Sequence, residues 1–252
     1  MTAAPLLETR GLTRNFGGFT AVSDVDFTLE AGARNAVIGP NGAGKTTFVN
    51  LLTGVLQPSA GQVLLKGREI TRISPAMRVK RGIARTFQIN RLFRGLTVLE
   101  NVYIAISERV GAANIMLRPA GSRKDVIEEA MGLLEMLKLA NDAKSRIVEL
   151  PYGRQRLVEI AIALGLRPEV LLLDEPMAGV PSAESHIILD AIDRLPSDIG
   201  VLIIEHDMDV VFRFARHITV LVRGAVFAEG PPDRIRSNED VRAVYLGQAA
   251  HG

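Results

Sequence analysis

The chain has 252 residues, of which 47% are hydrophobic and 23% charged, and its formal net charge is +2. These values indicate a globular protein with a sizeable core, built as one large domain or as one domain with an inserted lobe. The absence of cysteine excludes disulfides and thiolate chemistry, and the chain has neither a signal-peptide pattern at its start nor an apolar run near the roughly 20 residues that span a bilayer.

Short β-branched or Leu-rich runs predict strands at 6–10, 24–29, 34–38, 62–66, 83–87, 169–174, 201–205, 217–222 and 225–229. Three of these runs contain AVI, VLLL and VLII, and such continuous apolar stretches are typical of strands buried on both faces. Helical patterns follow several strands, at 45–56, 182–195 and 207–216. This alternation predicts an α/β fold with a mostly parallel sheet and helices on both of its faces.

The middle of the chain has a different pattern, with two predicted helices at 97–109 and 122–139 and no strand between them. Thr97 with Glu100, and Ser122 with Asp125, resemble the capping boxes that begin helices. We therefore expect residues 89–150 to form an inserted helical subdomain, and residues 1–88 and 151–252 to form the α/β core of a single domain.

A basic stretch precedes this insert. No acidic residue lies between Glu69 and Glu100, and the basic residues there are Arg72, Arg78, Lys80, Arg81, Arg85, Arg91 and Arg94. A solvated basic face and a surface that meets anionic lipid or nucleic acid are both compatible with this pattern.

Residues 39–46 read GPNGAGKT and fit the phosphate-loop pattern G-x-x-x-x-G-K-[ST]. They connect the predicted strand 34–38 to the predicted helix 45–56. The alternative interpretation is a Gly-rich strand-to-helix turn that binds no ligand. Glycines let successive N–H groups surround phosphate oxygens, and the helix N-terminus adds positive charge. Lys45 would reach the β- and γ-phosphates, and the Thr46 hydroxyl can ligate Mg²⁺. The candidate ATP-binding residues of this loop are Gly39, Pro40, Asn41, Gly42, Ala43, Gly44, Lys45, Thr46 and Thr47.

Acidic and imidazole groups follow two predicted buried strands. In VLLLDE, Asp174 would hold Mg²⁺ through water and Glu175 could polarise an attacking water, although two acids at a strand end can also cap the next turn. After VLII, His206 of EHD could touch the γ-phosphate or align the water, and an exposed or capping histidine is the alternative.

Two further side chains are candidates. Gln88 follows the predicted strand 83–87, where its amide can ligate Mg²⁺ and sense the γ-phosphate, or it is a plain surface residue. Phe16 could stack on an adenine, or it is an ordinary core residue.

The order of these features resembles that in the ATP-binding subunit of ABC transporters over nearly the whole chain. Along the chain the features are an aromatic residue, the phosphate loop, Gln88, the helical insert, ELPYGRQ, LLLDEP and EHD. The resemblance implies a P-loop NTPase (RecA-like) fold with an additional antiparallel β region, and ATP and Mg²⁺ as cofactors. It also implies ATP hydrolysis that involves Lys45, Gln88, Glu175 and His206, with Thr46, Gln88 and Asp174 as metal ligands.

ELPYGRQ, residues 149–155, lies where that family carries its signature, usually Leu-Ser-Gly-Gly-Gln. In the family, two subunits pack head to tail, and the signature of one closes over the ATP of the other. This implies that Tyr152, Gly153 and Gln155 contact nucleotide, with Gln155 as the signature glutamine. Pro151 departs from the family's serine and lacks its hydroxyl, and Pro181 departs from the usual Asp or Asn of the segment that crosses the dimer interface.

Within the family, IARTFQINRLFRGLTVLENV most resembles the branched-chain amino acid importers. This implies a homodimer or a heterodimer with a second ABC ATPase, permease subunits and, indirectly, a periplasmic or extracellular substrate-binding protein, at the cytoplasmic face of the inner membrane. Nucleic acid is not expected. The alternatives are transport of urea, amides or aromatic acids, lipopolysaccharide export, a non-transport ABC switch and a regulatory subunit without turnover.

Overall fold

The computed structural model describes residues 4–86, 92–111, 123–181 and 184–249. Their strands form two sheets. An antiparallel sheet has the order β2-β1-β4-β5 and consists of β1 (Leu7–Phe16), β2 (Phe19–Leu29), β4 (Ala60–Leu65) and β5 (Arg68–Glu69). The second sheet has the order β10-β9-β3-β8-β7-β6 and consists of β3 (Arg34–Ile38), β6 (Ile83–Arg85), β7 (Val170–Asp174), β8 (Gly200–Ile204), β9 (His217–Val222) and β10 (Ala225–Gly230). Its strands pair in parallel except for β10 on β9, as the predicted mostly parallel sheet requires.

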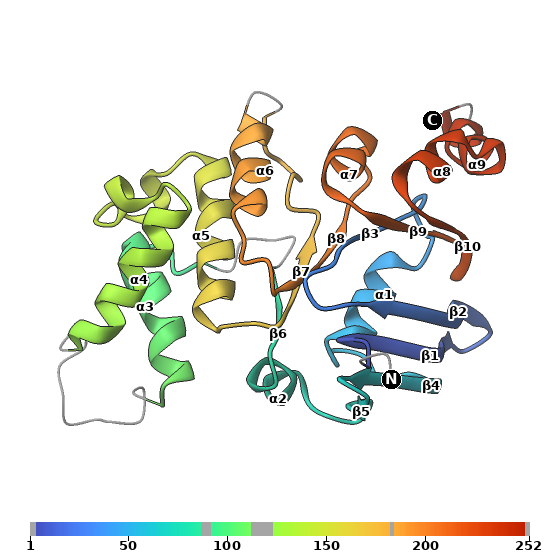
Figure 1. Ribbon diagram of the computed structural model, residues 1–252, viewed down its shortest axis with the longest axis horizontal. Coiled ribbons are helices and arrows are strands. Elements are labelled where there is room, and N and C mark those ends of the chain that lie inside the picture. The colour runs from blue at the N-terminus through green and yellow to red at the C-terminus, as the bar shows by residue number, and fades with distance from the viewer. Residues whose placement is uncertain (1–3, 87–91, 112–122, 182–183, 250–252) are drawn as a thin grey trace.

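The helices of the described residues are α1 (Lys45–Leu52), α2 (Pro75–Lys80), α3 (Val98–Arg109), α4 (Lys124–Met136), α5 (Tyr152–Gly165), α6 (Ser185–Asp193), α7 (Met208–Phe214), α8 (Pro232–Ser237) and α9 (Glu239–Ala249). In Figure 1, α1 lies between the two sheets, while α5, α6 and α7 cover the other face of the six-stranded sheet and α3 and α4 lie beyond α5. The structure thus places helices on both faces of the parallel sheet.

β7 illustrates why the sheet is buried on both faces. Val170 and Leu172 join the core between the two sheets, whereas Leu171 and Leu173 join the core beneath the helices. Successive side chains of a strand point to opposite faces, so a continuous apolar run fills two cores at once. The near-continuous apolar runs of the sequence therefore predicted these strands correctly.

Several predicted boundaries change in the structure. β1 extends to Phe16 and β2 begins at Phe19, because a tight turn at 17–18 joins them into one long hairpin. The helix predicted to reach residue 56 ends at Leu52, where Gly54 adopts a positive φ of 76° that cannot continue a helix. Sequence reasoning also missed β5, α2, α8 and α9.

The capping predictions differ in outcome. At α3 the Thr97 hydroxyl accepts from the Glu100 N–H, and the Glu100 side chain accepts from the Thr97 N–H, so this capping box is confirmed. At α4 the N-cap residue is Arg123 without a side-chain cap, and Ser122 lies outside the described residues.

Arg78 on α2 is buried and closes the C-terminal end of α1. Its guanidinium donates to the carbonyls of Leu51 and Leu52 at 2.7 Å each, and to those of Thr71 and Ile73 at 2.7 and 3.2 Å. The last carbonyls of a helix have no partner within the helix, and a cation there also meets the negative end of the helix dipole. Arg78 thus belongs to the core and not to a basic surface.

Candidate nucleotide-binding site

The phosphate loop, residues 39–46, connects β3 to α1 as predicted, and its backbone is fixed by close packing. Gly39 has φ 154° and Gly44 has φ 95°. A Cβ atom at Gly39 would lie 2.2 Å from the Leu221 carbonyl oxygen, and one at Gly44 would lie 2.3 Å from the Ala21 carbonyl oxygen. Glycine is therefore required at both positions, and β2 and β9 hold the loop in place.

The Lys45 side chain is buried inside this loop. Its ammonium donates to the carbonyl oxygens of Gly39 at 2.6 Å and Pro40 at 3.0 Å. Burial lowers the pKa of Lys45, and the charges of Glu175 and Asp174 oppose that shift. The structure thus brings both predicted carboxylates within electrostatic reach of the predicted phosphate-binding lysine.

Asp174 is buried at the end of β7 and is already paired with a cation. Its carboxylate accepts from the Arg85 guanidinium at 2.5 Å, and Arg85 also donates to the Asn50 side-chain oxygen at 2.7 Å. Arg85 comes from the basic stretch of the sequence, but it faces the site. Sequence reasoning missed this residue because the pairing joins positions that lie far apart in the chain.

The donor set of the site fits Mg²⁺. Thr46 places an exposed hydroxyl at the start of α1, and Asp174 offers carboxylate oxygen, while Gln88 lies outside the described residues. Among the described residues, no group of three or more acidic or histidine side chains could hold a metal by itself. Mg²⁺ commonly binds through one or two protein oxygens together with phosphates and water, and this is the arrangement that these residues allow.

Glu175 begins a tight turn after β7. Its φ is 45°, a conformation that non-glycine residues rarely adopt, and its N–H donates to the Ile204 carbonyl at 2.9 Å. The turn continues with the Ala178 N–H donating to the Glu175 carbonyl at 2.9 Å. This backbone sets where the Glu175 side chain begins, directly after Asp174, and its role in hydrolysis stays a prediction.

Glu205 is a buried acid that sequence reasoning passed over. Its side chain is 0% exposed, and its two oxygens accept from the N–H groups of Met177 at 3.0 Å and His206 at 3.1 Å. Burial raises the pKa of Glu205, and these backbone hydrogen bonds oppose the shift. The signal in the sequence was an acid directly after the buried strand VLII. The His206 side chain, by contrast, is 65% exposed beside the site.

The signature segment, residues 149–155, forms the start of α5. Pro151 is the N-cap residue and makes no side-chain capping bond. The Gln155 amide donates to the Leu150 carbonyl at 2.9 Å, within its own segment. When Leu150 is matched to the leucine of the five-residue signature, Arg154 and not Gln155 stands at the position of the signature glutamine. The predicted nucleotide contact of Gln155 therefore stays a prediction, as do those of Tyr152 and Gly153.

The same chain does not bring α5 to its own phosphate loop. In Figure 1, α5 lies on the opposite side of β7 and β8 from α1. A contact between a signature segment and a bound nucleotide therefore needs a second subunit.

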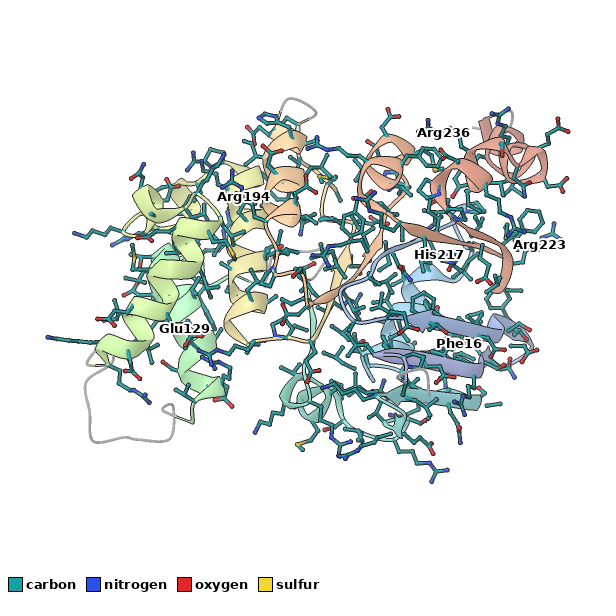
Figure 2. All side chains as sticks on the ribbon, viewed as in Figure 1. Phe16, Glu129, Arg194, His217, Arg223 and Arg236 are labelled. Carbon is teal, nitrogen blue, oxygen red and sulfur yellow. The ribbon has the colours of Figure 1, made fainter. Side chains whose placement is uncertain are left out.

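Phe16 is an exposed residue and not an ordinary core residue. The ring is 44% exposed at the end of β1, and the Arg14 guanidinium carbon lies 4.6 Å from its centroid. Figure 2 shows its position on the antiparallel sheet.

A family model described as ABC transporter matches residues 22–178, which is more than half of the chain and includes the phosphate loop and both carboxylates. This chain belongs to the ABC transporter family. The resemblance seen in the sequence is thereby confirmed, and the protein is an ABC-type ATPase. A second model, described as branched-chain amino acid ATP-binding cassette transporter, matches residues 225–251 of this ABC ATPase.

Two curated relatives are similar along their whole length. The high-affinity branched-chain amino acid transport ATP-binding protein BraF of Pseudomonas aeruginosa is 40% identical, and the match covers 97% of this chain and 99% of BraF. LivG of Escherichia coli K12, which carries the same description, is 37% identical with the same coverage.

Solved structures agree with the fold. The ADP conformation of an ABC transporter cassette has a TM-score of 0.85 and 32% identity, covering 96% of this chain and 99% of that one. A nucleotide-free cassette has a TM-score of 0.83 and 31% identity, covering 96% and 98%. A dimeric bacterial ABC transporter cassette has a TM-score of 0.75 and 25% identity, covering 90% and 98%. The P-loop NTPase fold is therefore confirmed for this ABC ATPase, and cassettes of its family form dimers. No helix among its described residues is long and apolar enough to cross a bilayer.

Proposed function

We propose that this ABC ATPase powers the uptake of branched-chain amino acids or related small polar solutes. The full-length similarity to BraF, with 40% identity over 97% of the chain, carries this proposal. The match of residues 225–251 to the branched-chain amino acid cassettes supports it from a separate segment. The comparisons support this cargo class and not the alternatives of urea, amides, aromatic acids or lipopolysaccharide.

The residues around the phosphate loop divide the work of hydrolysis. Lys45 leaves the loop carbonyls and neutralises the β- and γ-phosphates. Thr46, Asp174 and Gln88 would hold Mg²⁺, which supplies positive charge beside the transferred phosphoryl group. Glu175 polarises the attacking water, and the exposed His206 orients the γ-phosphate. Phe16 stacks on the adenine.

The working unit is a pair of such subunits, either identical or with a second ABC ATPase. Tyr152, Gly153 and the N-terminal end of α5 in one subunit cover the ATP held at residues 39–46 of the other. ATP shifts the pair toward its closed state, and the helical subdomain at 89–150 carries the movement to permease subunits on the cytoplasmic face of the membrane. A periplasmic or extracellular binding protein delivers the solute to the permease.

Lys45→Ala is expected to weaken ATP binding by at least about tenfold, because a buried cation that faces the phosphates is lost. Calorimetric titration with ATP and Mg²⁺ measures the affinity. Lys80→Ala removes a lysine from the exposed end of α2 and serves as the control. Equal affinities for the two variants would place the nucleotide elsewhere.

The Lys45→Ala and Lys80→Ala variants also test the proposed cargo, in an uptake experiment with cells. Cells that lack this chain should lose uptake of radiolabelled leucine, isoleucine and valine, and the wild-type chain and Lys80→Ala should restore it. Lys45→Ala should not. Full uptake without the chain would contradict the proposed cargo.

Pro151→Ser is expected to lower the KM for ATP by roughly three- to tenfold, because it supplies the hydroxyl donor that the signature lacks. Pro231→Ser is a matched control, since Pro231 is also an N-cap residue without a side-chain capping bond, at α8. Steady-state phosphate release over a range of ATP concentrations gives both KM values. A KM that changes equally in both variants would exclude a contact between position 151 and the phosphate.

A further inference from the structure

The turn at residues 175–178 is held from two sides by buried charged side chains. The Glu205 carboxylate, at the end of β8, accepts from the Met177 N–H at 3.0 Å. The Arg156 guanidinium, on α5, donates to the Ala178 carbonyl at 3.3 Å. The anion thus binds an N–H of the turn and the cation binds a carbonyl, so both hydrogen bonds are charge-assisted.

The second oxygen of Glu205 connects this turn to the neighbouring loop. It accepts from the N–H of His206 at 3.1 Å. One carboxylate therefore fixes two peptide groups, one in the turn that begins with Glu175 and one at His206 itself. Because each carboxylate oxygen accepts from its own N–H, an amide at this position would turn an NH₂ donor toward one of these two N–H groups.

Arg156 gives the turn a connection to the signature helix. The guanidinium is buried, forms an ion pair with Glu159 at 2.9 Å and lies 5.1 Å from the centroid of the Tyr152 ring. Tyr152 is the first residue of α5. The turn that positions Glu175 is thus in direct contact with the helix that presents the signature.

We propose that Glu205 is a positioning residue for ATP hydrolysis that acts through Glu175 and His206, and that Arg156 couples the same turn to α5. The proposal rests on the roles of Glu175 and His206 in the proposed function. The structure gives the physical reason: Glu175 has a backbone φ of 45°, and such a conformation persists only when its surroundings fix it. Glu205 and Arg156 provide that constraint from buried positions.

The first test is Glu205→Gln, which preserves the volume of the side chain and removes one acceptor. We expect kcat for phosphate release by the purified chain to fall at least tenfold, while the ATP affinity measured by calorimetry stays within about twofold. Glu129→Gln is the matched control, because Glu129 pairs with Arg109 and Arg167 in the helical region at the left of Figure 2, away from Phe16. An unchanged kcat for Glu205→Gln, or a parallel loss of ATP affinity, would overturn the positioning role.

A double substitution separates positioning from a general loss of structure. In the Glu175→Gln background, Glu205→Gln should reduce the residual single-turnover rate far less than it reduces the wild-type rate, because residues that act as one unit are not additive. Multiplicative effects would show that Glu205 does not act through Glu175. Arg156→Lys keeps the charge and loses the forked donor, and it should lower kcat at constant ATP affinity; an unchanged kcat would refute the coupling to α5. Failure of the wild-type chain to bind ATP would instead reject the proposed function itself.

Discussion

Glu175→Gln is expected to reduce ATP turnover about 100-fold or more while ATP binding changes little, because the amide cannot polarise water as a carboxylate does. The fold of the turn should survive, since its hydrogen bonds to Ile204 and Ala178 use the backbone of Glu175 and not its side chain. The variant should therefore accumulate in the ATP-bound state.

Single-turnover phosphate release and calorimetric ATP binding measure the two properties separately. Glu169→Gln is a suitable control because Glu169 directly precedes the first residue of the same strand, in an exposed ion pair with Lys66. Turnover of Glu175→Gln at the wild-type rate would remove Glu175 from the chemical step.

Arg78→Leu is expected to lower the free energy of unfolding by roughly 3–5 kcal/mol, because it leaves buried carbonyls without donors at the end of α1. This is a large part of the roughly 5–15 kcal/mol that stabilises a typical domain. Burial lowers the pKa of Arg78 to about 10, so the guanidinium is charged at neutral pH and the lost hydrogen bonds are charge-assisted.

Urea denaturation measures this loss from the shift of the transition midpoint. Arg81→Leu removes an exposed arginine one turn away at the end of α2, and its effect should stay within about 0.5 kcal/mol. A change below about 1 kcal/mol for Arg78→Leu would mean that water replaces the guanidinium at these carbonyls.

The parts of the fold that the sequence predicted are those coded over short distances. GPNGAGKT predicted the turn between β3 and α1, because glycine spacing and the following helix are local properties. The run VLLLDE predicted both a doubly buried strand and the two acids at its end. α2, α8 and α9 were missed because each is short or only weakly amphipathic, so tertiary packing decides whether it forms.

The electrostatic partners of the site could not be predicted in the same way. Arg85 and Asp174 are 89 positions apart, and Met177 and Glu205 are 28 positions apart. A sequence shows that a charge exists, but parallel strand order decides which residue it meets. The basic stretch is the clearest example, since one of its arginines caps a helix in the core and another holds an acid of the nucleotide site.

The hydrogen bonds of Lys45 to its own loop have an expected consequence for the choice of nucleotide. The ammonium must exchange the carbonyls of Gly39 and Pro40 for phosphate oxygens. A monophosphate does not extend far enough to offer that exchange, whereas a di- or triphosphate does. We therefore expect Lys45 to discriminate between nucleotides by the length of their polyphosphate chain.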